Sequence, residues 1–89
     1  MREITIDCRD FSPRIKLHRA FAQALSFPEH YGNNLDALHD CLTAVCEDTR
    51  IRLLHWEAAE CSLEAYARSA KRAILEAAVH NSGLAVIFD

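Results

Sequence analysis

The sequence has few of the residues that interrupt regular secondary structure. Its 89 residues include only two Gly and two Pro, which leaves little room for linkers or low-complexity segments. It also has no internal repeat of the kind that builds a solenoid. A chain of this length forms one domain with one modest core. We therefore expect a single domain over residues 1–89.

Long apolar runs and an excess of positive charge are also missing. No segment approaches the roughly 20 apolar residues that span a bilayer, and Met1 leads directly into a strand-like segment rather than a signal peptide. The simplest expectation is a cytoplasmic protein with no membrane partner. The net charge of −3 argues against direct binding of nucleic acid, which requires a basic surface. It suits a basic protein partner better.

Sequence patterns typical of metal sites and of catalysis are absent. The four cysteines contain no CxxC pair and lack the spacing of zinc ligands; they are Cys8, Cys41, Cys46 and Cys61. There is no HExxH motif and no nucleophile paired with a base. We expect free thiols, no metal, no cofactor and no enzymatic activity.

The spacing of apolar residues predicts the order β-α-α-β-α-β. Strands are expected at 2–8, 51–56 and 84–88, and helices at 13–25, 35–46 and 63–80, with a short extra helical turn at 57–61. Helical crossovers favour parallel pairing and right-handed connections. We predict an α/β fold, a three-stranded parallel sheet packed by three to four helices. The continuous apolar run of the last strand predicts that it is covered on both faces.

Capping residues define the expected ends of the helices. Ser12 and Pro13 are predicted to be the N-cap and first position of the first helix, and Asn34 and Ser62 to cap the next two. Gly83 is expected to end the last helix in the left-handed conformation.

The predicted helix 35–46 has two distinct faces. With successive residues about 100° apart, one side carries an apolar stripe of Leu35, Leu38, Cys41, Leu42 and Val45. The opposite side carries a polar stripe of Asp36, His39, Asp40 and Thr43. The simplest interpretation of the polar stripe is a solvated helix face. The apolar stripe is expected to face the core.

The two aspartates of this polar stripe point to a more specific role. Asp36 and Asp40 lie four residues apart, so two like charges are stacked without a basic residue between them, which is mildly destabilising. The helix dipole explains Asp36, in the first turn, but not Asp40. A carboxylate on a rigid helix can imitate a phosphate, because it accepts charge-assisted hydrogen bonds from Arg, Lys or protonated His. An enzyme that cleaves RNA needs such cations beside the scissile phosphate.

Two segments carry a resemblance to a known family. Leu17-His18 and the run Pro28 to Thr43 (PEHYGNNLDALHDCLT) resemble the barstar family, whose signature here is PEYYGxNLDALWDCLT. Barstars are intracellular inhibitors of barnase-type ribonucleases and occlude the active site with the second helix and the loop before it. The resemblance implies that residues 28–34 and 35–46 bind a small basic ribonuclease as a 1:1 heterodimer.

The resemblance also implies individual roles for residues of this chain. Asp40 matches the dominant aspartate of the family, which occupies the phosphate subsite, and Asp36 and Thr43 match flanking contacts. The predicted binding residues of the loop and helix are completed by His30, Tyr31, Gly32, Asn34 and His39. Glu76 corresponds to an acidic contact of the family on the last long helix. The alternative interpretation is that Glu76 is solvated and paired with Arg72.

Three positions depart from the family pattern. His30 replaces the first Tyr of the loop, His39 replaces the helix Trp, and Ala44-Val45 stands where Gly-Trp is frequent. Aromatic anchors supply much of the buried area of interfaces, so these exchanges indicate either a cognate enzyme different from barnase or a function that has drifted from that of the family.

Three other functions stay open from the sequence alone. The chain could be an immunity protein, an antitoxin against a bacterial ribonuclease toxin unlike barnase. It could be a regulatory or scaffold module that binds a basic partner other than a nuclease. It could also be an enzyme or metal protein that uses His30, His39, Asp36 and Asp40.

Overall fold

The computed structural model describes residues 1–89. Its elements are β1 (Arg2–Asp7), α1 (Ile15–Leu25), α2 (Leu35–Thr43), β2 (Thr49–Leu54), α3 (Trp56–Leu63), α4 (Ala65–His80) and β3 (Leu84–Phe88). This confirms the predicted α/β class and element order. The short turn expected at 57–61 is a full helix, α3.

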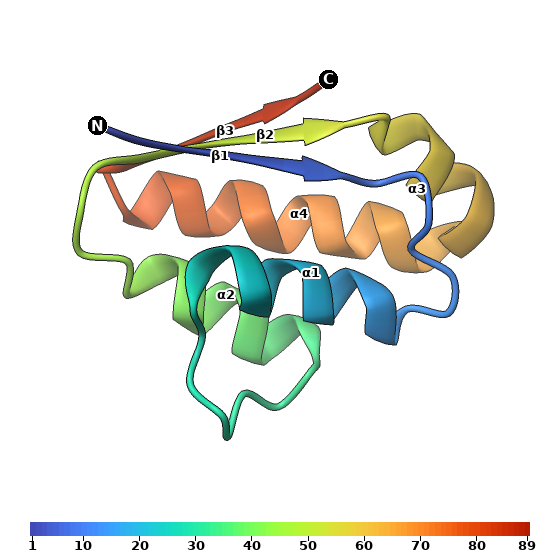
Figure 1. Ribbon diagram of the computed structural model, residues 1–89, viewed down its shortest axis with the longest axis horizontal. Coiled ribbons are helices and arrows are strands. Elements are labelled where there is room, and N and C mark those ends of the chain that lie inside the picture. The colour runs from blue at the N-terminus through green and yellow to red at the C-terminus, as the bar shows by residue number, and fades with distance from the viewer.

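The three strands form one parallel sheet, as predicted, and the structure places them in the order β1-β2-β3 (Figure 1). Ile51 of the central strand pairs with Ile4 on one side and Val86 on the other. Buried and exposed residues alternate along β2, where Thr49, Ile51 and Leu53 are buried and Arg50 and Arg52 are exposed. The alternation shows that only one face of the sheet is covered.

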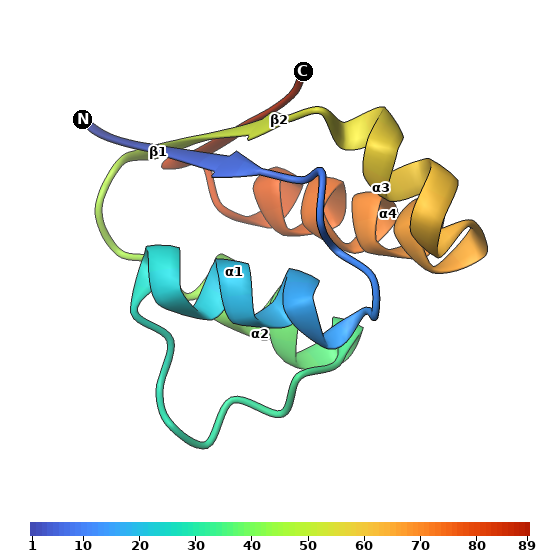
Figure 2. The same ribbon diagram turned by 45° about the vertical axis from the view of Figure 1, so that its right-hand side comes forward.

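All four helices lie on that one face of the sheet, and the opposite face is open (Figures 1 and 2). The prediction that the last strand is covered on both faces is therefore wrong, because Ala85 is exposed and Ile87 is 38% exposed. The connections explain this result. Right-handed crossovers that advance in one direction across a sheet place all their helices on the same side.

The core lies between the sheet and the helices. α2 packs closely against α4, and α4 turns inward a stripe of three alanines and one isoleucine, Ala67, Ala70, Ile74 and Ala77. Leu38 and Leu42 of α2 and Leu17 and Phe21 of α1 are fully buried. Each such side chain stabilises the fold by about 1.5–3 kcal/mol through burial. No helix is long and apolar enough to cross a membrane.

Several predicted element ends are wrong. α1 begins at Ile15 behind Arg14, which makes no side-chain cap, and Ser12-Pro13, joined by a cis peptide bond, lies in the preceding loop. The cause is Phe11, which is only 2% exposed, because its burial draws this loop over the core before the helix starts. Gly83 does not adopt a positive φ.

The ends of α2, β2 and α4 also differ from the prediction. α2 ends at Thr43 rather than 46, and β2 runs from Thr49 to Leu54 rather than from 51 to 56. Ser62 belongs to α3 and does not cap α4. The chain enters α4 through Glu64, whose positive φ of 52° is not evident from the sequence. Tertiary contacts set these boundaries, as shown below for α2.

Candidate partner-binding site

The candidate site consists of the loop 26–34 and helix α2. The loop turns away from the sheet at the far side of the helical layer (Figures 1 and 2). It starts where Ser26 takes the left-handed conformation and ends α1. It ends at Asn34, whose side-chain oxygen accepts a hydrogen bond of 2.8 Å from the Ala37 N–H. The predicted N-cap of α2 is therefore confirmed, and it fixes the direction in which the helix leaves the loop.

The structure confirms the two faces predicted for α2. Leu38 and Leu42 are fully buried against α4, whereas Asp36 and Asp40 are exposed. The side chain of Asp40 is 85% exposed, and neither aspartate has a lysine or arginine within ion-pairing distance. The face is thus an uncompensated patch of negative charge on a helix held rigidly from behind.

Two histidines join this acidic face to α4. The His39 Nδ1 lies 3.6 Å from Oδ1 of Asp40, and the His39 ring stands edge-on to that of His80, with centroids 6.1 Å apart. The Thr43 hydroxyl donates a hydrogen bond of 2.8 Å to the carbonyl of His39. His80 was not predicted as a site residue, although it lies one turn after Glu76 on the same side of α4.

Glu76 and His30 are exposed at the margins of the face. Glu76 lies on α4 without the predicted ion pair to Arg72, since no N···O contact within 4 Å joins the two. His30 lies at the exposed end of the loop. Both side chains are exposed, and their role as partner contacts stays a prediction.

Tyr31, a predicted binding residue, is instead buried at 9% exposure. Its hydroxyl lies 2.7 Å from Nδ1 of His18, and its ring packs on Phe27 at a centroid distance of 4.9 Å. Tyr31 therefore positions the loop from inside. The neighbouring Gly32 is exposed, and a Cβ there would lie 3.0 Å from the Asn34 Nδ2, so an added methyl group would require the Asn34 side chain to shift by a few tenths of an ångström.

The partner of Tyr31 is a histidine in the core. His18 is fully buried, and its Nε2 lies 2.6 Å from the hydroxyl of Tyr66 on α4. Burial lowers the pKa of His18, and the Arg14 cation, stacked over the Tyr66 ring at 4.9 Å, lowers it further. In the sequence, Tyr66 is expected on the inner side of the last helix and His18 belongs to the segment that resembles the barstar family. The hydrogen bonds that join His18 to Tyr31 and Tyr66 were not predicted, because these residues are 13 and 48 positions apart.

A second polar anchor, also missed from the sequence, holds the end of α2. The Asn81 side-chain amide donates to the carbonyls of Leu42, Thr43 and Val45 at 3.1, 3.2 and 3.0 Å. The last carbonyls of a helix have no partner within the helix. Asn81 satisfies them from the far end of α4, and this explains why α2 stops at Thr43.

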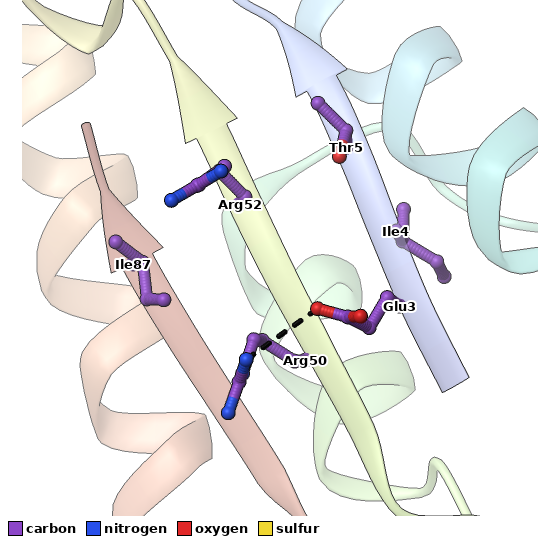
Figure 3. A pocket seen from close by; sticks show the side chains of 6 residues that line it. All are labelled: Glu3, Ile4, Thr5, Arg50, Arg52 and Ile87. Carbon is purple, nitrogen blue, oxygen red and sulfur yellow. Dashed lines mark hydrogen bonds and ion pairs between the residues drawn. The ribbon is translucent and has the colours of Figure 1, made fainter. Parts of the chain in front are cut away.

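Charged residues on the open face of the sheet form a different arrangement (Figure 3). A cavity there is lined by Glu3, Ile4, Thr5, Arg50, Arg52 and Ile87. Its arginines are paired, Arg50 with Glu3 at 3.4 Å and Arg52 with Asp89 at 3.3 Å. The charges on this face balance one another, unlike those of α2.

The cysteines and histidines do not gather into a metal site. All four cysteines are free thiols, as expected, and no three His, Cys, Asp or Glu side chains lie close enough together to hold a metal ion. Burial raises the pKa of Cys8 to about 12, so this thiol stays protonated and behaves as a small apolar side chain.

Comparison with known proteins agrees with this arrangement. Residues 1–86 match the family described as Barstar (barnase inhibitor), and the chain belongs to that family. It is also 56% identical over 43 residues to the Bacillus subtilis (strain 168) protein named "Putative ribonuclease inhibitor YrdF". That match covers 48% of this chain and 47% of the relative, so it spans about half of the relative's length.

Proposed function

We propose that this chain inhibits a small basic ribonuclease by covering its active site with α2 and the loop 28–34. The observation that carries the proposal is the Asp40 carboxylate. It is exposed, has no lysine or arginine partner within the chain, and stands on a helix that is fixed at both ends by Asn34 and Asn81. In the complex, Asp40 takes the position of the scissile phosphate, among the cations that the enzyme needs for catalysis.

The remaining exposed residues have supporting roles in this proposal. Asp36 extends the negative surface toward the loop, and His30, His39, Thr43 and Glu76 form its margin. Opposite charge accelerates the encounter of the two proteins, so association slows as the salt concentration rises. The chain supplies a binding surface and no catalytic group, and one inhibitor occludes one active site.

The proposal is tested by calorimetric titration into barnase-type ribonucleases at low salt, with RNA cleavage measured in parallel. We expect a 1:1 complex with loss of cleavage, and Asp40→Ala should weaken binding by about 100-fold or more, because it leaves buried cations of the enzyme unpaired. Asp10→Ala is the matched control. Its side chain is also 85% exposed but lies between β1 and α1, so binding should be unchanged.

Two outcomes would contradict the proposal in different ways. Equal affinity of the wild type and Asp40→Ala would exclude phosphate mimicry. A complex that leaves RNA cleavage intact would instead indicate a regulatory or scaffold module that binds a basic partner other than a nuclease.

A further inference from the structure

A recess with apolar walls lies beside the acidic face of α2. It lies between the start of the loop on one side and the last turn of α2 with the two residues after it on the other, and its volume is about 240 Å³. The lining residues are Leu25, Ser26, Phe27, Pro28, Cys41, Ala44 and Val45. Ser26 supplies the one polar side chain among them. The side chains that line the recess therefore offer mainly apolar contact.

Both walls of the recess are held in place by contacts already described. On the loop side, the Phe27 N–H donates to the Ala22 carbonyl at 3.0 Å, and the Phe27 ring packs on Tyr31, which His18 anchors. On the helix side, Asn81 holds the carbonyl of Val45. A recess with fixed walls loses little conformational entropy when it is filled.

The recess continues the acidic face rather than forming a separate surface. Ala44 is exposed and lies four residues after Asp40, so the two are neighbours along α2. No basic residue lines the recess. A partner that seats a cation against Asp40 therefore also covers the opening.

We propose that this recess receives one apolar side chain of the ribonuclease, next to the cation that pairs with Asp40. The inference rests on the proposed function and adds a determinant of specificity to it. A charged side chain would lose its hydration there without a compensating partner, whereas an aliphatic or aromatic one gains from burial. The cognate enzymes are thus those with an apolar residue projecting beside the basic active-site cleft.

The first experiment fills the recess from within. Ala44→Leu adds bulk at the exposed C-cap of α2, where φ is −85° and ψ is −4°; this negative-φ conformation is open to leucine, so the thermal unfolding temperature should stay near that of the wild type. Its affinity for the barnase-type ribonuclease that the wild type binds should fall by about 10–100-fold. Ala85→Leu, which adds the same bulk on the open face of the sheet, should bind like the wild type.

The second experiment uses Cys41 as a reporter on the wall. Complex formation should slow its reaction with N-ethylmaleimide by at least about 10-fold, while the exposed Cys61 on α3 reacts at an unchanged rate. Unaltered affinity of Ala44→Leu together with undiminished labelling of Cys41 would overturn the recess proposal, even if Asp40→Ala abolished binding. If no ribonuclease bound the wild type, the proposed function would fail, and this inference would fail with it.

Discussion

The His18 imidazole and the Tyr31 hydroxyl form a buried hydrogen bond of 2.7 Å that ties α1 to the loop 26–34. The second ring nitrogen of His18 reaches the Tyr66 hydroxyl on α4. A neutral imidazole has one donor and one acceptor nitrogen, so the two tyrosines satisfy both. The loop that carries the candidate binding residues is thereby connected to two helices of the core.

Removal of the Tyr31 hydroxyl should destabilise the protein and loosen the loop. Tyr31→Phe leaves one ring nitrogen of His18 buried without a partner, which costs about 1–3 kcal/mol in the free energy of unfolding. Tyr66→Phe is the matched control, since it removes the other hydrogen bond of His18 without touching the loop. Urea unfolding measures both losses, and amide hydrogen exchange at residues 27–34 should increase only in Tyr31→Phe. Equal exchange in the two variants would contradict an anchoring role for Tyr31.

Protonation of His18 should make the stability depend on pH. Its pKa is lowered from the ordinary value of 6.5, so the unfolded chain binds a proton that the folded chain does not. The free energy of unfolding therefore falls as the pH decreases below about 6.5, until the folded pKa is reached, and His18 contributes no slope above that range. Hydrogen bonds to Arg9 hold the pKa of Asp7 at about 2. The contribution of Asp7 to the pH dependence of stability therefore lies at lower pH than that of His18.

Chemical denaturation between pH 5 and pH 8, roughly the range of an ordinary histidine, measures this dependence. His18→Gln retains a hydrogen-bond donor and an acceptor but cannot titrate. The wild type should therefore lose its advantage in free energy of unfolding over this variant as the pH falls. A difference that stays constant across the range would show that His18 does not carry the effect.

Loss of the Asn81 amide should destabilise the C-terminal end of α2. Asn81→Ala leaves the carbonyls of Leu42, Thr43 and Val45 without this donor, and we expect a cost of about 1–3 kcal/mol in unfolding free energy. Asn81→Asp retains the shape but presents acceptors to acceptors, so it should be at least as destabilising. A Ser82→Ala control, at an exposed neighbouring position, should change the stability little. An Asn81→Ala protein as stable as this control would refute the anchor.

Substitution of Gly32 by alanine should weaken the N-cap of α2. The added Cβ would lie 3.0 Å from Nδ2 of Asn34 and would displace the side chain that caps the helix, at a cost of about 1 kcal/mol. Gly83→Ala is the comparison, because its Cβ meets the carboxylate of the exposed Asp48 at 2.9 Å, which is free to rotate away. Urea midpoints should fall for Gly32→Ala and much less for Gly83→Ala. The reverse order would show that the cap tolerates the extra methyl group.

Local sequence patterns predicted the elements well where each pattern lies within the element. Residues only a few positions apart indicate the first strand, through the apolar Ile4 and Ile6, and the N-cap at Asn34. They also indicate the two faces of α2. The ends at Ile15 and Thr43 do not, since burial of Phe11 and hydrogen bonds from Asn81 decide them. These partners are distant in sequence, so no local period reports them.

The sequence by itself determined the α/β class, the parallel order of the strands and the negative stripe of Asp36 and Asp40, because periodicity, crossover length and charge are local properties of the chain. Only the tertiary structure decided that one face of the sheet is open, that Tyr31 points inward to His18, and that an apolar recess adjoins Asp40. Each of these depends on which distant segments meet in the core, and the contacts between them form only when the helices have packed.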